Sequence, residues 1–498
     1  MSTTTSRPST TTVEREQDLV ASIPTGLFVG GRWREAAGGG TVAVEDPATG
    51  AVLTRVADAT PADGDAALAA AVAAADGWRR TPARERGEVL RRAFDLVTAR
   101  AEDFALSMTL EMGKPLAEAR GEVTYGAEFL RWFSEEAPRI SGRYSQNPVG
   151  GSRLLTMKQP VGPVLAILPW NFPLAMGTRK IAPALAAGCT VVVKPATQTP
   201  LTTLLLARVL AEAGVPDGVV NVVTTTSTGE VMEPLIRDPR LRKLTFTGST
   251  AVGRRLVEQS AQQLLRVSME LGGNAPFLVF DDADLDAAVA GAMLAKMRNS
   301  GEACTAANRF YVQRGIAREF SAAFAERMGE LVVGRGTGEG VQVGPLIDAR
   351  ARDGVAQRVR EAVAGGARVV VGGEPLAGDG YFYPPTVVQD VRAGARLLTE
   401  ETFGPVAPVV VFDDEAEGLA LANDSEYGLI GYAFTQGLDR GLRVAEALDT
   451  GMVGLNSGVV SNAAAPFGGV KASGFGREGG AEGIEEYLET KCVGFPLD

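Results

Sequence analysis

The chain has 498 residues, of which 45% are hydrophobic and 22% charged, a composition typical of a globular protein with two or three domains. Its 49 Lys and Arg against 60 Asp and Glu give a formal net charge of -11, which argues against nucleic acid or an anionic membrane surface as the main partner. The sequence contains no histidine. This excludes Ser-His-Asp and Cys-His catalysis and most catalytic zinc sites, so we predict no metal and expect catalysis by Cys, Glu, Asp, Lys or Tyr.

The cysteines and the N-terminus indicate a cytoplasmic protein. Cys189, Cys304 and Cys492 are too few, and odd in number, for a disulfide framework, which fits a reducing compartment. Residues 1–24 are rich in Ser, Thr and charged side chains, so we expect a flexible tail rather than a targeting signal. No apolar run approaches the roughly 20 residues of a membrane span.

The first half of the chain predicts helices and then a regular strand–helix alternation. The Ala-rich residues 66–76 and the Glu- and Arg-rich residues 83–104 are expected to be helical. From about residue 160, short apolar runs alternate with amphipathic stretches. Strands are predicted at VGPVLAILP, CTVVVKP, VVNVV and KLTFTG, and helices at Leu174–Ala187, Leu201–Ala213 and about Ala251–Gln263.

The alternation resumes after Asn274. Strands are predicted at PFLVF, RFYVQ, ARVVVGG, VAPVVVF and GMVGLN, and helices at Leu285–Asn299, Ile316–Val332 and Leu438–Leu448. Strands separated by helices of this length pair in parallel, so the fold class is α/β with two Rossmann-like parallel units. The flanking runs LLTMKQP and YLETKCVGF predict strands of a small arm that pairs with another subunit.

Cys304 is the candidate nucleophile. It stands in NSGEACTAANRF, on a small, Gly-rich turn between a predicted helix and the strand RFYVQ. Such a turn exposes a thiol to a cleft, and nearby amide N–H groups favour its thiolate. The alternative is a buried, inert cysteine. We expect structural roles for Cys189, which opens an apolar strand, and for Cys492 near the C-terminus.

Glu270 and Asn171 both follow apolar strands. Glu270, in VSMELGGNAPF, faces a cleft at a strand end, where partial desolvation would raise its pKa toward that of a general base. The alternative is a rim carboxylate bonded to nearby amides. Asn171, in LPWNFP, can hold a developing oxyanion together with the nucleophile's backbone N–H. The alternative is an Asn that caps the following helix.

FTGSTAVG is a candidate cofactor loop between a strand and a helix. Gly248 and Gly253 allow the backbone to approach a pyrophosphate, and Ser249 can donate to it at the helix N-terminus. A Gly-rich turn of this kind is a weak signal, and it departs from the G-x-G-x-x-G pattern. Lys194, where VVVKP leaves its strand, suits ribose hydroxyls or a phosphate, and the alternative is a solvated lysine.

Taken together, the motifs resemble those of the aldehyde dehydrogenase superfamily. From about residue 25 to the end, the family's order and spacing are shared by PWNFP, VVVKPA, FTGST, ELGGNAPF, the Cys304 turn, EETFGPVAPV and PFGGVKASGFGREGG. The resemblance implies three parts besides the tail. These are a cofactor domain (25–145 and 160–271), a catalytic domain (272–465) and an oligomerisation arm (146–159 and 481–498).

The resemblance also implies roles for individual residues. The residue matching Cys304 attacks the aldehyde, Asn171 and the Cys304 N–H hold the oxyanion, and Glu270 activates the water that hydrolyses the thioester to a free acid. Lys180 and Glu478 match positions that support the site, through proton relay. Cofactor contacts are implied for Trp170, Lys194, Thr197, Gly248, Ser249, Gly253, Leu271, Glu401 and Phe403.

The succinate-semialdehyde dehydrogenase branch of the family is the most similar. In that branch the residues matching Arg179, Arg298 and Ser461 hold the substrate's far carboxylate, and unpaired guanidiniums would disfavour an uncharged aldehyde. The alternative is that Arg179 only pairs with a neighbouring acid. Glu302 and Ala303 depart from the branch's usual Gln-Thr, and Glu302 would add negative charge if it pointed inward. Another ω-carboxylated or aliphatic aldehyde, such as glutarate semialdehyde, and a catalytically silent binding protein are the alternative functions.

Thr197 bears on the choice of cofactor. NAD-specific relatives often carry Glu here, which bonds the ribose hydroxyls and repels a 2′-phosphate. Thr197 removes that repulsion and leaves Lys194 free to pair with the phosphate. We therefore predict that NADP is preferred and NAD tolerated. By resemblance alone, we expect a homodimer or homotetramer.

Overall fold

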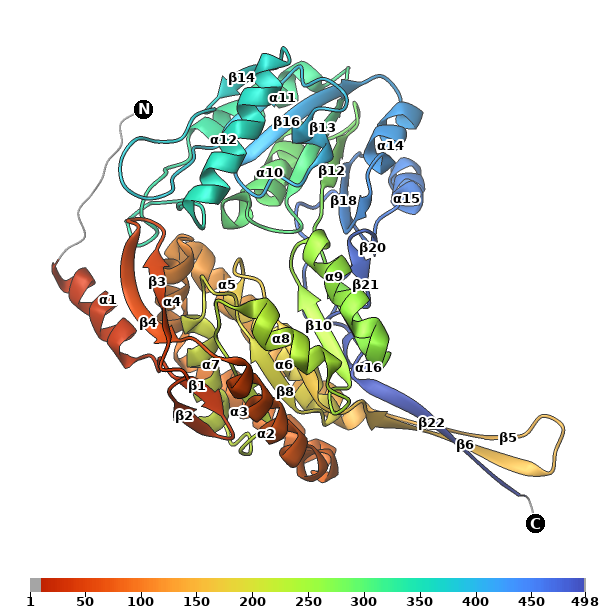
Figure 1. Cartoon of the computed structure of the whole chain (residues 1–498). Coiled ribbons are helices and arrows are strands. Elements are labelled where there is room, and N and C mark those ends of the chain that lie inside the picture. Colours follow the sequence, from red (N-terminus) through yellow and green to blue (C-terminus); the bar gives the residue numbers. More distant parts are fainter. Residues whose placement is uncertain (1–9, 497–498) are drawn as a thin grey trace.

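The computed structural model describes residues 10–496, which form two α/β bodies and a projecting three-stranded arm (Figure 1). Each body contains one mainly parallel sheet. The predicted α/β fold class with two Rossmann-like units is confirmed. Across residues 10–496, the structure has no helix long and apolar enough to cross a membrane.

The first body is built on a sheet with the strand order β2-β1-β9-β8-β7-β10-β11-β21. Its parallel strands are short apolar runs that the sheet buries on both faces. They are β7 (Val164–Ile167), β8 (Val191–Lys194), β9 (Val220–Val222), β10 (Lys243–Thr247) and β11 (Arg266–Glu270). The crossover helices are α6 (Pro173–Ala187), α7 (Leu201–Glu212), α8 (Thr228–Arg237) and α9 (Thr250–Ser260), the last followed by a 3-10 turn (Ala261–Gln263).

Antiparallel strands and an N-terminal layer complete this body. Strands β1 (Leu27–Val29) and β2 (Arg32–Arg34) extend one edge, and β21 (Gly474–Phe475) returns from the C-terminal region to pair with β11 at the other. A hairpin, β3 (Thr41–Asp46) with β4 (Ala51–Ala57), lies beside them. The remaining helices are α2 (Pro61–Arg80), α3 (Ala83–Ala99), α4 (Ala101–Met112) and α5 (Leu116–Glu136), so the stretch predicted at 83–104 is divided at Arg100.

The second body has the strand order β14-β15-β16-β13-β12-β18-β19, parallel except for the edge strand β14. Its strands are β12 (Ala275–Val279), β13 (Ala307–Gln313), β14 (Arg368–Val371), β15 (Thr386–Gln389), β16 (Val406–Phe412), β18 (Ile430–Phe434) and β19 (Met452–Leu455). Its helices are α10 (Leu285–Met297), α11 (Ala317–Gly329), α12 (Ala349–Ala364), α13 (Arg396–Thr399), α14 (Glu415–Asn423) and α15 (Leu438–Ala447). A small ladder, β17 (Tyr427–Gly428) with β20 (Val470–Lys471), lies beside the sheet.

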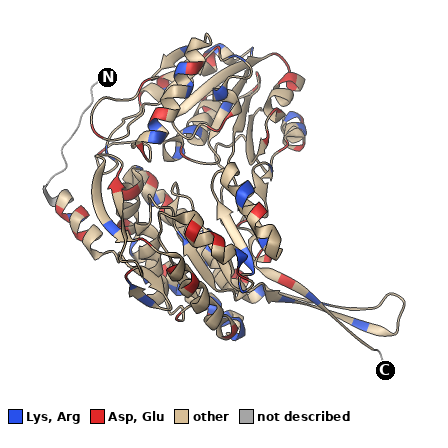
Figure 2. Cartoon of the chain, viewed as in Figure 1, with Lys and Arg blue, Asp and Glu red and all other residues tan. Residues whose placement is uncertain are grey.

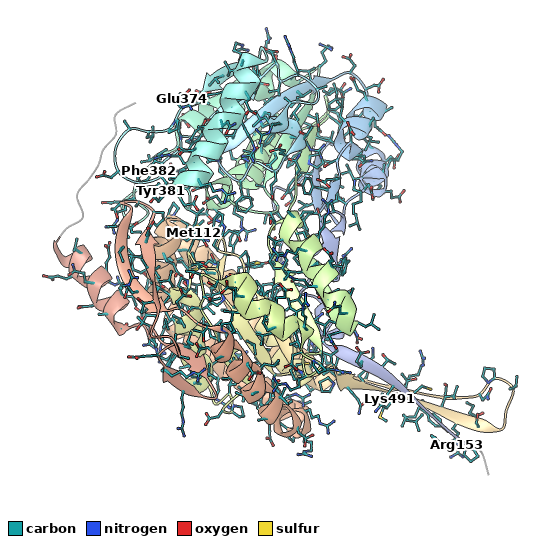
Figure 3. All side chains as sticks on the ribbon, viewed as in Figure 1. Met112, Arg153, Glu374, Tyr381, Phe382 and Lys491 are labelled. Atoms are coloured by element: carbon teal, nitrogen blue, oxygen red, sulfur yellow. The ribbon has the colours of Figure 1, made fainter. Side chains whose placement is uncertain are left out.

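Charged residues of both signs are interspersed along the outer helices of both bodies (Figure 2). Several form pairs one helical turn apart, such as Arg80 with Asp76 and Arg237 with Glu233. The bodies also touch directly, since Tyr381 donates its backbone N–H to Pro47 O at 3.0 Å. Figure 3 labels Tyr381 and Phe382 at this junction.

The arm consists of β5 (Arg143–Gln146), β6 (Ser152–Pro160) and β22 (Leu488–Pro496), with β6 in the middle of an antiparallel sheet. The short helix α16 (Glu482–Glu485) precedes β22. Figures 1 and 3 show the arm extending beyond both bodies, with Lys491 nearer its base and Arg153 farther out. Its first strand begins before the predicted start of the arm at 146.

The prediction of a flexible tail over 1–24 is wrong for the described part, where α1 spans Thr10–Ser22. One face of this helix packs against α4 and β4. Leu19 and Ile23 are buried there, and Glu16 forms an ion pair with Arg335 at 2.9 Å. The polar composition concealed the spacing of Glu16, Leu19 and Ile23, which places all three on one helix face. Residues 1–9 of the predicted tail lie outside the described residues.

Candidate active site

The candidate residues of the first body gather at the carboxyl ends of its parallel strands. The chain runs outward from β7 to β8 and β9 on one side, and continues with β10 and β11 on the other. Strand order therefore reverses between β7 and β10, where open α/β sheets bind ligands. The residues that follow these strand ends or close them are Trp170, Asn171, Lys194, Gly248, Ser249, Glu270 and Leu271.

Cys304 lies on the turn between a 3-10 segment (Arg298–Gly301) and β13, and is half-buried. The turn passes so close to the loop after β11 that a Cβ at Gly273 would stand 2.3 Å from the Cys304 carbonyl oxygen, so only glycine fits there. Burial raises the pKa of the Cys304 thiol to about 12, since the opposing effect of Arg179 and Arg298 is smaller and Glu401 and Glu270 raise it further. Burial therefore opposes the predicted stabilisation of the thiolate by nearby amides. The thiol needs a base.

The backbone before Cys304 is strained. Asn299 and Ser300 both have positive φ, at 55° and 56°, a region that non-glycine residues rarely occupy. Side chains hold it in place. Asn299 Nδ2 donates to the carbonyl oxygens of Asn171 and Glu302 at 3.0 and 2.9 Å, and Ser300 Oγ accepts from Gly344 N at 3.2 Å.

Asn171 is buried and directed at the nucleophile turn. Its Nδ2 donates to the carbonyl oxygen of Glu302 at 3.0 Å, which leaves the second N–H of the amide for another acceptor. The side chain does not cap α6, because the N-cap residue of that helix is Phe172. The capping alternative is thereby ruled out, and the amide is placed as an oxyanion donor requires.

Glu270 closes β11 and is buried, with no hydrogen-bond partner for either carboxyl oxygen among residues 10–496. Burial raises its pKa well above the ordinary value. Glu478 raises it further, while Arg179 and Lys180 oppose the shift. The alternative of a carboxylate bonded to nearby amides is excluded for the described chain. A desolvated carboxyl with free lone pairs is suited to general-base catalysis.

Lys180 and Glu478 lie beside Glu270 but are bonded to each other. The Lys180 ammonium donates to Glu478 Oε1, and also to Thr245 Oγ1 at 3.1 Å. Burial raises the pKa of Glu478, but Lys180 and Arg179 outweigh burial and hold that pKa below its ordinary value. The cluster therefore places one ionised and one unpaired carboxyl side by side.

Arg179 differs from its predicted role. Its Nε donates to Glu478 Oε2 at 2.5 Å, its Nη1 donates to the Tyr125 hydroxyl at 3.3 Å, and the side chain is buried. The guanidinium also lies over the Phe467 ring, 3.8 Å from its centroid. The alternative of pairing with a neighbouring acid is what the structure shows, because a carboxylate in contact already satisfies this cation.

Arg298 is the accessible cation of the site. Its guanidinium lies over the rings of Phe172 and Tyr125, 5.1 and 5.5 Å from the centroids, and it lowers the pKa of Cys304 from nearby. No Asp or Glu of residues 10–496 forms an ion pair with it. Ser461, half-buried in the segment after β19, makes no hydrogen bond to either arginine in the described chain.

Glu302 does not place a negative charge in the substrate space. Its side chain is fully buried, and Oε1 accepts from Ile347 N at 3.0 Å. Burial raises the pKa of this carboxyl well above its ordinary value, more than the Ile347 hydrogen bond and Lys114 lower it. The carboxyl is enclosed by protein and bonded to Ile347, so it does not point into the substrate space as the predicted conflict with an acidic substrate would require.

The described residues fit a dinucleotide. Ser249 is the exposed N-cap of α9 and its hydroxyl makes no capping bond, so the helix start can accept an anion. Lys194 is buried with no protein partner for Nζ in the described part of the chain, and burial lowers its pKa to about 8. Thr197 donates from Oγ1 to Thr225 O at 3.1 Å, so its side chain leaves the space beside Lys194 uncharged.

Gly248 and Gly253 make different contacts in the structure. Gly248, at the start of the loop, donates its N–H to Glu270 O at 3.0 Å. A Cβ at Gly253 would lie 2.3 Å from Leu271 Cδ2, so Leu271 packs directly on α9 at this position. This packing contact requires a glycine at 253, and the predicted contacts of Gly253 and Leu271 with a cofactor stay predictions.

The second body contributes Glu401 and Phe403 across from this loop. Glu401 Oε1 accepts from Gly273 N at 3.0 Å, and burial raises the pKa of Glu401 to about 7. Phe403 contacts Trp170 edge to face, with ring centroids 5.3 Å apart. These two contacts connect the bodies on either side of the Cys304 turn.

Two residues that the sequence analysis missed, Lys114 and Glu122, form a buried ion pair behind Asn171 at 2.5 Å. Lys114 follows α4 and Glu122 lies in α5, so no helical spacing connects them. Lys114 stands in a Gly-Lys-Pro sequence between α4 and α5, and nothing in that local sequence indicates that the lysine is buried.

Comparison with known proteins identifies the family. The profile of the aldehyde dehydrogenase family matches residues 33–493. A succinate-semialdehyde dehydrogenase of Paenarthrobacter nicotinovorans is 61% identical, covering 89% of this chain and 98% of that protein. A glutarate-semialdehyde dehydrogenase of Pseudomonas aeruginosa is 51% identical, covering 94% and 97%. The crystal structure of an NADP-dependent enzyme of Escherichia coli is 48% identical and superposes with a TM-score of 0.94, covering 96% of this chain and 99% of that one. The chain therefore belongs to the aldehyde dehydrogenase family and is an NAD(P)-dependent oxidoreductase acting on aldehydes.

Proposed function

We propose that the enzyme oxidises succinate semialdehyde to succinate through a thioester on Cys304. The observation that supports this substrate is the Arg298 guanidinium, which lies near Cys304 without a carboxylate partner in the described chain. A substrate with a carboxylate a few carbons from its aldehyde would pair this cation while its carbonyl reaches the sulfur. The similar proteins from Paenarthrobacter and Pseudomonas act, by their names, on aldehydes of this kind.

The residues divide the reaction between them. The Cys304 sulfur bonds to the aldehyde carbon, and the thiol proton passes to Glu270, the nearby carboxyl without partners. The oxygen of the tetrahedral adduct accepts from the second Asn171 N–H and the Cys304 backbone N–H. Bound NAD(P) supplies the two-electron acceptor that converts this adduct to the thioester. Glu270 then releases its proton through the Lys180–Glu478 cluster. The ionised Glu270 takes a proton from water, and the water oxygen bonds to the thioester carbon as the Cys304 thiolate departs.

A matched pair of aldehydes tests the substrate. We would compare kcat/KM for succinate semialdehyde and for butanal, which has the same number of carbons and no carboxylate, beside Cys304→Ala. A preference for succinate semialdehyde of about a hundredfold or more, lost in Cys304→Ala, is expected. Equal efficiencies would contradict the proposed substrate. Glutarate semialdehyde, one methylene longer, is the alternative substrate, and a higher efficiency with it would replace the first choice.

We propose NADP as the preferred cofactor. Lys194 is a buried cation without a protein partner in the described chain, and Thr197 places no carboxylate beside it. A 2′-phosphate would supply the missing anion. Trp170, Gly248, Ser249, Glu401 and Phe403 are proposed to complete the cofactor site, and Ser461 the substrate site. A lower KM for NADP than for NAD is the expected result, and the reverse order would refute the preference.

We also propose a homodimer or homotetramer that assembles through the arm. Strands β5 and β22 form the edges of the arm's sheet, and Tyr144 on β5 is an exposed aromatic side chain. Unpaired strand edges are prone to pairing with another chain. Light scattering of the purified protein would give the mass, and a monomer would refute this proposal.

The three free thiols support a cytoplasmic location.

A further inference from the structure

We propose that the buried Lys114–Glu122 pair is a positioning device for Asn171, a role that rests on the proposed function of Asn171 as an oxyanion donor. Lys114 Nζ contacts Glu122 Oε2 at 2.5 Å and donates to the Asn171 carbonyl oxygen at 2.7 Å. Both side chains are almost completely buried. The lysine therefore binds the backbone of the very residue whose side chain points to the nucleophile turn.

Glu122 fixes the helix that starts just after Asn171. Its Oε1 accepts from the backbone N–H groups of Leu174 and Ala175, at 3.0 and 3.1 Å, in the first turn of α6. The N-cap residue Phe172 supplies no capping side chain. One carboxylate thus satisfies two free helix N–H groups and a cation at the same time.

The Asn171 peptide is held from a second side. Asn299 Nδ2 donates to the same Asn171 oxygen at 3.0 Å and to Glu302 O at 2.9 Å. Asn171 Nδ2 donates to Glu302 O as well. The backbone oxygen and the side-chain amide of Asn171 are therefore both tied to the segment that carries Cys304, and Lys114 is the charged member of that network.

A second buried glutamate shows that capping alone does not require a lysine. Glu111 accepts from Leu201 N at 2.6 Å and Thr202 N at 2.9 Å, at the start of α7. Glu111 has no ion pair with a residue of the described chain, and α7 contains no candidate catalytic residue. Of these two buried glutamates, only Glu122 has a cation partner in the described chain. Capping by a buried glutamate therefore does not by itself require a lysine, and Lys114 also donates to the Asn171 carbonyl oxygen.

Two matched glutamate variants separate positioning from capping. Glu122→Gln can keep one carbonyl oxygen for both helix N–H groups while it breaks the ion pair next to Asn171. Glu111→Gln loses one of its two helix hydrogen bonds and breaks no ion pair in the described chain, so it reports the effect of weakened capping alone. We would measure the pre-steady-state burst of reduced cofactor, KM for the aldehyde, and thermal unfolding for each variant. We expect Glu122→Gln to slow the burst about tenfold or more, since removing an oxyanion donor costs about 10²–10³ in rate. Glu111→Gln is expected to leave the burst unchanged. Equal slowing by both variants would overturn the proposal.

A double-mutant cycle between Lys114→Met and Asn171→Ala tests whether the lysine acts through Asn171. We expect Lys114→Met to slow the burst in the wild-type background and to have little further effect in Asn171→Ala. Lys114→Arg is expected to recover part of the rate. Equal slowing in both backgrounds would overturn the positioning role while keeping the oxyanion role. If Asn171→Ala itself leaves the burst unchanged, the proposed function of Asn171 fails, and the inference fails with it.

Discussion

Glu270 and Glu478 are buried side by side, but only Glu478 has hydrogen-bond partners. Glu478 accepts from both Arg179 and Lys180, whereas neither oxygen of Glu270 has a partner in the described chain. Burial and the neighbouring Glu478 raise the pKa of Glu270, whereas at Glu478 the effect of Lys180 and Arg179 outweighs burial and holds the pKa below its ordinary value. The pKa of Glu270 is therefore raised, and the pKa of Glu478 is lowered. This separation gives the site one ionised group that stays charged and one that exchanges a proton.

Replacing Glu270 by Gln should slow both thioester formation and thioester hydrolysis, because Glu270 is the proposed proton acceptor in each step. Both the burst of reduced cofactor and the steady-state rate are expected to fall by about 10²–10⁴-fold, because general-base catalysis contributes about that much. Stopped-flow fluorescence of the reduced nicotinamide measures the burst. In the wild type, kcat should fall as the pH falls below the raised pKa of Glu270, since the protonated form is not a base. That limb should be absent in Glu270→Gln.

Cys304→Ala is the control and should give neither burst nor turnover. A Glu270→Gln variant that turns over at the wild-type rate would contradict the assignment of Glu270 as the base. An unchanged burst followed by slow turnover would instead show that a group other than Glu270 accepts the thiol proton.

Arg298 and Arg179 should have different effects on substrate selectivity. Arg298→Gln is expected to lower kcat/KM for succinate semialdehyde by about 10–100-fold, the value of a hydrogen bond to a charged group, with less than about threefold change for butanal. Arg179→Gln should lower kcat/KM for both aldehydes to the same extent, because the Arg179 guanidinium is already ion-paired with Glu478. Parallel initial-rate measurements give the comparison. If Arg298→Gln lowers kcat/KM for both aldehydes by the same factor, Arg298 does not bind the substrate carboxylate.

The alternation of apolar strands and helices predicted both parallel sheets, because burial on both faces leaves a clear pattern in the sequence. Helix α1 was missed since its buried residues are few and are separated by charged ones. Local sequence patterns also could not predict that β21 returns to the first sheet and pairs with β11. Two residues, Gly474 and Phe475, are too short a run to show any period.

The site residues could be predicted where a motif fixes a local turn. They could not be predicted where packing between distant segments determines the partner or the environment of a side chain. Glu270 closes β11, Asn171 follows β7, and Cys304 lies on the Gly-rich turn before β13, so each stands in a motif at the end of a strand. The partner of Arg179 could not be deduced, since Glu478 is 299 residues away in the chain. Similarly, the raised pKa of Cys304 results from burial, which no property of the Gly-rich turn reveals.

The preference for NADP should depend on pH through Lys194. Burial lowers the pKa of this lysine to about 8, so its charge is present below that pH and is lost above it. We expect the ratio of kcat/KM for NADP to that for NAD to fall between pH 7 and pH 10, by up to about tenfold per pH unit above the pKa, because this ratio reports the free enzyme. Lys194→Met should show a low ratio at every pH. A ratio that is constant with pH in the wild type would contradict the pairing with a 2′-phosphate.

Glu302→Gln should stabilise the protein at neutral and alkaline pH. The folded-state pKa of Glu302 is raised above its ordinary value near 4.5, so the folded state holds a proton that the unfolded state releases. The free energy of unfolding of the wild type therefore falls as the pH rises above about 4.5, by up to about 1.4 kcal/mol per pH unit, until the pH passes the raised pKa. A glutamine keeps the oxygen that accepts from Ile347 N and has no proton to lose. Urea unfolding of both proteins at pH 5 and pH 8 measures the difference, which should be larger at pH 8, while the burst of reduced cofactor stays within about twofold. A difference that is the same at the two pH values would show that Glu302 is ionised in the folded protein.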